Sequence, residues 1–145
     1  FRSLDNLFTC HQGLGAAARV ERIAAVDYGA PQDFGMYSLL NQPAERNEAV
    51  QIAALDELGL PRLDLLKIDV EGMEMEVLAG GRGMIARHRP WCWVEYWMVG
   101  AEAVAGAFAG LGYQIYLVDG LNLLCAPSDR LAASGLAFEG ATVQT

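Results

Sequence analysis

The stretch from residue 62 to residue 81, RLDLLKIDVEGMEMEVLAGG, constrains the fold more than any other part of the chain. Residues 63–68 place leucine or isoleucine on both faces of an extended strand. Strands that are apolar on both faces are typical of central positions in parallel sheets, which helices cover on both sides. We therefore expect a buried strand here, followed by a helix from about residue 72 to residue 87.

Other segments extend this alternation of strands and helices. Residues 19–27 and 90–97 have the patterns of strands, residues 101–112 suggest a helix of small residues, and residues 4–11 show helical spacing. Two apolar runs around Asp119–Gly120 predict a hairpin that ends the sheet. With 145 residues, of which 53% are hydrophobic, the chain suits one α/β domain. We place this domain at residues 1–127 and leave residues 128–145 as a tail of unassigned structure.

Charge and composition bear on partners and location. Ten Lys and Arg against eighteen Asp and Glu give a net charge of −8, which disfavours a nucleic-acid partner, because phosphate backbones require clustered cations. No apolar run approaches the roughly 18 residues of a membrane span. The three cysteines are far apart and have no metal-ligand spacing, which is typical of a reduced intracellular protein. We expect a cytoplasmic protein.

Acidic residues gather where the strands are expected to end. Asp69 and Glu71 follow the strand at 63–68, Asp27 ends an earlier strand, and Glu95 lies near the end of a later one. Open α/β sheets bind ligands outside the carboxyl ends of their strands. This convergence is the main functional signal that the residues give by themselves.

The same carboxylates also have structural interpretations. Asp69 can cap the following helix, and Glu95 can form a buried ion pair. Glu74 falls on the inward stripe of the helix, where a first-turn glutamate can bond free backbone N–H groups. We favour capping for Glu74 and keep it as a substrate-binding candidate. A helix start crowded with carboxylates is a poor phosphate cradle, and the chain has no P-loop motif.

One run of residues resembles a known family. The pattern D-x-x-K-I-D-V-E-G-x-E-x-x-V-L-x-G is matched from Asp64 to Gly80, and Val94–Glu95 fits the strand that follows. These residues are similar to the FkbM-type family of S-adenosylmethionine-dependent methyltransferases. The segments RVERIAAVDYGA and AALDELGLPRLD are similar to those that precede the run, so the resemblance covers roughly residues 4 to 126.

The resemblance implies a Rossmann-like methyltransferase sheet. Its strand order would be 3-2-1-4-5-7-6, mostly parallel, with a C-terminal antiparallel hairpin. The family's first cofactor element, a glycine-rich turn after the first strand, has no counterpart here, nor has the acidic residue that ends the second strand. The resemblance therefore implies the C-terminal part of a domain that lacks its first two strands, and a fragment that is inactive and binds the cofactor weakly alone.

The resemblance also implies a reaction, namely methyl transfer from S-adenosylmethionine to a hydroxyl of a small-molecule, glycan or lipid acceptor. Positioning supplies much of the catalysis in such a displacement, and a hydroxyl acceptor benefits from a base. The residues that we assign are Asp69 and Glu71 as catalytic, Glu95 and Glu74 as substrate-binding, and Asp27 and Tyr28 as cofactor-binding.

Two other functions stay open. Asp69 and Glu71 could hold Mg²⁺ or Mn²⁺ in a metal-dependent transferase, because both ions prefer oxygen ligands. A domain without the glycine-rich turn could also be degenerate and bind only a partner.

Overall fold

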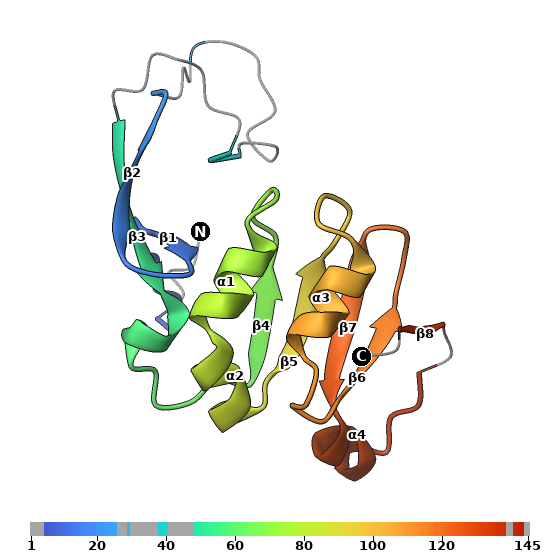
Figure 1. Ribbon diagram of the computed structural model, residues 1–145. Helices are drawn as coiled ribbons and strands as arrows, with labels where there is room; N and C mark the ends of the chain where they lie inside the picture. The colour runs from blue at the N-terminus through green and yellow to red at the C-terminus, as the bar shows by residue number, and fades with distance from the viewer. Residues whose placement is uncertain (1–4, 26–28, 30–37, 41–47, 139–140, 144–145) are drawn as a thin grey trace.

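The computed structural model describes residues 5–25, 29, 38–40, 48–138 and 141–143. Within these residues the protein is a mixed α/β structure with two sheets and four α-helices (Figure 1). None of the described helices is long and apolar enough to cross a membrane.

The first sheet has three strands in the order β1-β3-β2. β3 (Glu48–Ala54) lies between β1 (Gly13–Gly15), which runs parallel to it, and β2 (Arg19–Ile23), which runs antiparallel. A short 3₁₀ helix, η2 (Leu55–Leu58), follows β3.

The helix predicted over residues 4–11 is wrong for the described residues 5–11, which form a turn and irregular chain. Leu7 is 65% exposed and Phe8 86% exposed, so the apolar spacing that predicted the helix buries little. A short helix without packing is marginal in water, which explains the failure of the pattern.

The second sheet has five strands in the order β4-β5-β7-β6-β8. β4 and β5 are parallel, and the other neighbouring pairs are antiparallel. The strands are β4 (Leu65–Ile68), β5 (Trp91–Glu95), β6 (Tyr113–Leu117), β7 (Asn122–Pro127) and β8 (Thr142–Val143).

The predicted C-terminal hairpin is confirmed by the antiparallel pair β6–β7. Both described sheets are mixed instead of mostly parallel. In the second, β7 returns between β5 and β6 and so has antiparallel neighbours on both sides. In the first, β2 runs antiparallel to β3. β4 was expected to be buried on both faces. It is an edge strand among the described residues, and Leu65 on its outer face is 66% exposed.

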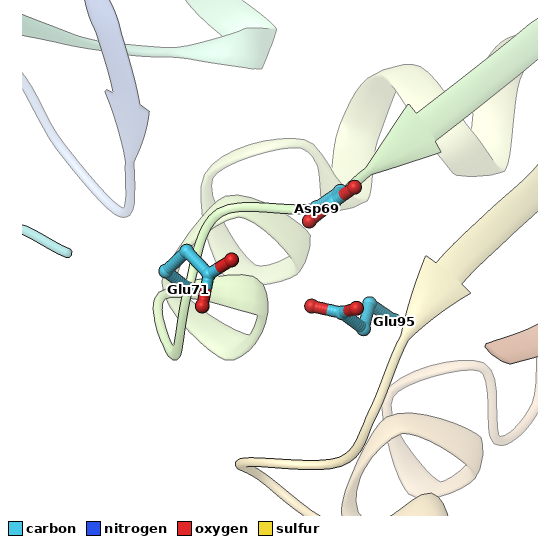
Figure 2. A group of neighbouring side chains, drawn as sticks. All are labelled: Asp69, Glu71 and Glu95. Atoms are coloured by element: carbon cyan, nitrogen blue, oxygen red, sulfur yellow. The ribbon is translucent and has the colours of Figure 1, made fainter. Parts of the chain in front are cut away.

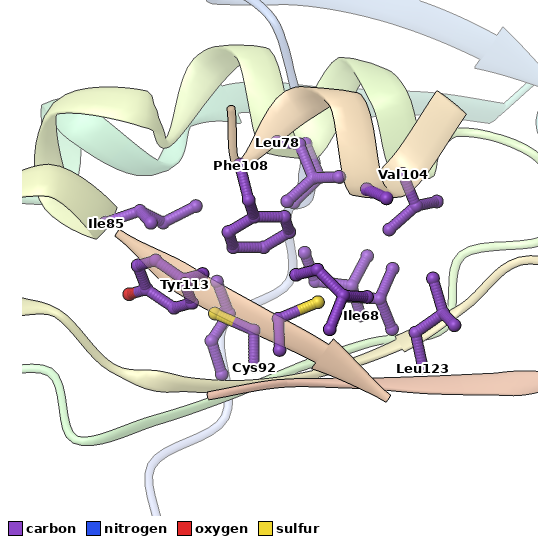
Figure 3. Close-up of a cluster of buried hydrophobic side chains, with 14 of the residues drawn as sticks. Ile68, Leu78, Ile85, Cys92, Val104, Phe108, Tyr113 and Leu123 are labelled. Carbon is purple, nitrogen blue, oxygen red and sulfur yellow. The ribbon is translucent and has the colours of Figure 1, made fainter. Parts of the chain in front are cut away.

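Three helices pack on one face of the second sheet (Figure 3). They are α1 (Glu74–Gly80), α2 (Arg82–His88) and α3 (Ala101–Ala107). Phe108, which follows α3, is 1% exposed and contributes the largest fully buried side chain of this core. The helix predicted over residues 72–87 is divided at Gly81, whose backbone leaves helical geometry (φ −113°, ψ 6°).

The first sheet reaches the second through a close contact between β1 and α1 (Figure 1). A Cβ atom on Gly80 would lie 2.0 Å from the backbone oxygen of Gly15, so only glycine fits there. Beside this contact, Arg19 forms a 2.7 Å ion pair with Glu76. Glu76 thus ties α1 to the first sheet.

Helix α4 (Ser128–Ser134) lies at the end of the sheet where β4 begins (Figure 1). Arg130 donates hydrogen bonds to the Arg89 backbone oxygen at 2.9 Å and to Asp64 at 3.3 Å. Leu131 is buried against the sheet face opposite to α1–α3, with Tyr116 and Leu124. The acidic residues predicted to form a site lie at the opposite end of the sheet, where β4 and β5 end.

Candidate functional site

Three carboxylates meet where β4 and β5 end (Figure 2). Asp69 follows β4, Glu95 is the last residue of β5, and Glu71 lies on the turn that leads to α1. One carboxylate oxygen from each residue lies within 4.8 Å of those of the other two. The parallel register, which pairs Ile68 with Val94, brings Asp69 and Glu95 to the same edge.

The turn that carries Glu71 has an uncommon backbone. Glu71 has a φ of 49° and Gly72 a φ of 101°, both in the region that favours glycine. For a residue with a Cβ atom this conformation costs about 1–2 kcal/mol. A Cβ atom on Gly72 would also lie 3.0 Å from Leu40 and 3.2 Å from Met98, so the position has little room.

Side chains on both sides of the turn bond its backbone. Ser38 Oγ donates a 2.6 Å hydrogen bond to the Glu71 backbone oxygen. Glu74 Oε1 accepts hydrogen bonds from the backbone N–H groups of Val70 and Gly72, each at 3.2 Å. Glu74 is only 2% exposed, so its carboxylate lies inside the turn, in line with the capping role that we favoured.

Charge is concentrated at this edge. Lys67 forms an ion pair with Asp69, and both side chains are well exposed, so the pair stabilises the fold only modestly. Burial raises the pKa of Glu95, and the negative charges of Asp69 and Glu71 raise it further. The indole of Trp97 donates a 3.2 Å hydrogen bond to Glu95, which opposes this effect.

The arrangement suits three kinds of chemistry. Carboxylates accept hydrogen bonds from hydroxyl groups, can take a proton from one of them, and can bind a divalent cation through oxygen. Each of these relieves the mutual repulsion of the three groups.

A surface pocket elsewhere in the molecule has a structural explanation. Asp56, Gly83, Met84 and Arg87 line it. The Asp56 carboxylate accepts hydrogen bonds from the backbone N–H groups of Gly83 at 2.9 Å and Met84 at 2.6 Å, so it caps the start of α2. This contact crosses 27 or 28 residues and leaves no local signal in the sequence.

The structure places the remaining candidates as follows. Asp27 and Tyr28, predicted to bind the cofactor, lie outside the described residues, and the assignment stays a prediction.

Two of the three cysteines are excluded as nucleophiles by their burial. Cys92 and Cys125 are fully buried, and burial raises the pKa of the Cys92 thiol to about 12. Neither has the accessible thiolate that a nucleophile needs.

Sequence reasoning missed two residues of this edge, Ser38 and Trp97. Ser38 bonds a residue 33 positions away, in a segment without clear pattern. Trp97 is the last residue of the apolar run PWCWVEYW, two positions beyond the end of β5, and it is 48% exposed and bonds Glu95. No pattern in the sequence points to either contact.

Comparison with known proteins gives one match. A family model described as "Methyltransferase FkbM domain" matches residues 16–115, which include all three carboxylates. No curated protein and no solved structure matches significantly.

Proposed function

The chain belongs to the FkbM methyltransferase family, and on this basis we propose that it serves methyl transfer from S-adenosylmethionine to a hydroxyl acceptor. The observation that carries the proposal is the meeting of Asp69, Glu71 and Glu95 within the matched residues, at the carboxyl ends of two parallel strands. Open α/β sheets bind their ligands at this position.

We assign the acceptor side of the reaction to the three carboxylates. Asp69, held by Lys67, accepts a hydrogen bond from the acceptor hydroxyl and orients it. Glu71 takes the hydroxyl proton as the oxygen attacks a methyl group. Glu95, whose pKa is raised, binds a neighbouring polar group of the acceptor. A positioned base of this kind accelerates a reaction by about 10²–10⁴-fold.

The described residues do not form a cradle for the cofactor. None of the described strands is followed by a glycine-rich turn of the family's kind, and Asp27 and Tyr28 lie outside the described part. These two residues are our candidates for the adenine side of the cofactor.

We further propose that the chain is the C-terminal part of a Rossmann-like domain. The order β4-β5-β7-β6 equals the last four positions of the expected order 3-2-1-4-5-7-6. The free edge of β4 among the described residues is where strand 1 of that order would pair. A small-molecule, glycan or lipid acceptor and a cytoplasmic location remain part of this proposal.

The functional test uses the protein encoded by the complete coding sequence. It is incubated with S-adenosylmethionine and a panel of hydroxylated acceptors, and release of S-adenosylhomocysteine is measured. Acceptor-dependent release is expected. If no panel member supports it while the protein binds a macromolecular partner, the alternative of a degenerate binding domain is favoured.

A second candidate, a metal-dependent transferase, is favoured by the distance among the three carboxylates. Asp69, Glu71 and Glu95 could each supply one oxygen to Mg²⁺ or Mn²⁺. Repeating the assay with EDTA separates the two candidates. Turnover that EDTA leaves unchanged argues against a metal, whereas loss of turnover that Mg²⁺ restores favours it.

A further inference from the structure

The peptide unit between Glu71 and Gly72 is held at both of its polar atoms. Its carbonyl oxygen accepts the 2.6 Å hydrogen bond from Ser38 Oγ, and its N–H group donates the 3.2 Å hydrogen bond to Glu74 Oε1. We propose that Ser38 and Glu74 are positioning residues that hold Glu71 toward Asp69 and Glu95. This inference rests on the proposed function of the three carboxylates.

The need for two such bonds follows from the backbone of the turn. Glu71 has a φ of 49°, which is disfavoured for any residue with a Cβ atom, and such residues persist only where their surroundings fix them. Rotation of the Glu71–Gly72 peptide would break both bonds at once. With both bonds lost, the turn could rearrange on either side of Glu71, relieve its disfavoured φ and carry the Glu71 carboxylate away from the other two.

Glu74 holds the turn from inside the fold. The oxygen that bonds Gly72 also accepts the N–H group of Val70, so one atom ties the residues on either side of Glu71. At 2% exposure Glu74 lies beneath the turn. We therefore assign it a positioning role in place of direct contact with substrate. Its other oxygen, Oε2, is buried without a hydrogen-bond partner in the described part of the chain, an arrangement that costs stability.

Ser38 holds the turn from the opposite side. Its hydroxyl also accepts a 3.2 Å hydrogen bond from the Leu40 N–H group, which fixes the direction in which the hydroxyl can donate. Leu40 packs close to Gly72, since a Cβ atom built on Gly72 would lie 3.0 Å from it. The described residues 38–40 therefore rest on the turn and connect a distant part of the sequence to the position of Glu71.

The test compares disruptive and conservative variants of the complete protein. Ser38→Ala removes the hydroxyl and Ser38→Thr keeps one. Glu74→Met removes both oxygens, while Glu74→Gln keeps an oxygen that can accept both N–H groups. We expect Ser38→Ala and Glu74→Met each to lower kcat by roughly 10- to 100-fold, the scale of a small misplacement at a reacting centre. Cofactor affinity should change little, and the conservative variants should stay within about twofold of the parent protein.

Two further measurements make the test decisive. The double variant of Ser38→Ala and Glu74→Met should lower kcat by a smaller factor than the product of the two single factors, because both residues act on one peptide. Hydrogen exchange at the Gly72 amide, followed by NMR, should speed up in both disruptive variants, whether or not the protein proves to be a methyltransferase. Ser38→Ala alone suffices if Glu74→Met does not fold.

Unchanged exchange at Gly72 in Ser38→Ala would overturn the structural part of the inference. Fast exchange with unchanged kcat would overturn the positioning role. Equal losses of kcat in Glu74→Gln and Glu74→Met would overturn the positioning role of Glu74, because they would show that its charge matters and not its hydrogen bonds to the turn. If the parent protein shows no methyl transfer, the proposed function fails, and the exchange result still decides whether the two residues hold the turn.

Discussion

At the scale of single residues, the balance of charge among Asp69, Glu71 and Glu95 is the most informative feature. One oxygen from each of the three carboxylates lies within 4.8 Å of the others, and burial together with the charges of Asp69 and Glu71 raises the pKa of Glu95. Glu95 therefore holds a proton more readily in the folded protein than in the unfolded chain. By linkage, Glu95 favours the folded state at low pH, and this contribution is lost as the pH rises from the unfolded pKa of about 4.5 through the raised folded value.

Glu95→Gln should therefore stabilise the protein more at pH 7 than at pH 4. The substitution removes a negative charge that Asp69 and Glu71 repel, and this charge is fully present only at the higher pH. Urea unfolding at both pH values measures the difference. Glu102→Gln, an exposed glutamate in the first turn of α3, is the matched control. An equal effect of Glu95→Gln at the two pH values would contradict this account of its pKa.

The cysteines give a second prediction at this scale. Cys10 is exposed, whereas Cys92 and Cys125 are buried, and burial raises the pKa of both buried thiols. A thiol reagent should modify Cys10 alone in the folded protein and all three cysteines in denaturant. Mass spectrometry of the modified peptides locates the label. Rapid labelling of Cys92 in the folded protein would show that the core opens readily.

At the scale of elements, the contact between β1 and α1 decides how the two sheets are joined. Gly80→Ala would place a methyl group against the Gly15 backbone oxygen, at 2.0 Å without rearrangement. Overpacking of this kind costs about 1–3 kcal/mol, or more where backbone must move. The free energy of unfolding, from denaturant titration, is expected to fall by at least this amount.

Gly106→Ala in α3 is the matched control, because a Cβ atom there meets nothing within 4 Å. Alanine is the better helix former by about 0.5–1 kcal/mol, so this variant should be as stable as the parent or more so. Equal effects of the two substitutions would mean that β1 does not pack on α1 as closely as the structure shows.

The elements also show what the sequence could and could not predict. β4, β5 and the β6–β7 hairpin were predicted because their apolar runs are long and bounded by turn residues. The same reasoning located the strand ends, and with them the meeting of Asp69, Glu71 and Glu95. The break at Gly81 and the bond from Ser38 to Glu71 were not predicted, since both depend on packing between distant segments. The exposed Leu65 shows that a two-faced apolar pattern does not fix whether a strand has a neighbour on each side.

At the scale of the whole molecule, the proposal of a partial domain makes a prediction about cofactor binding. The described residues hold the three carboxylates that we propose to act on the acceptor, without a glycine-rich turn of the family's kind after any described strand. Purified residues 1–145 should therefore bind S-adenosylmethionine only weakly. Isothermal titration calorimetry measures this directly, and micromolar binding by this chain alone would disprove the partial-domain proposal.

The central claim is that the carboxylates at the ends of β4 and β5 act on the methyl acceptor. The measurement that tests it most directly is a comparison of Asp69→Asn with the parent in the complete protein, by turnover and by cofactor binding, with Glu102→Gln as control. Asp69→Asn should lower turnover by roughly 10- to 100-fold, the scale of a misplaced acceptor at the reacting centre, and leave the cofactor dissociation constant nearly unchanged. Unchanged turnover in Asp69→Asn would contradict the claim and remove Asp69 from the mechanism.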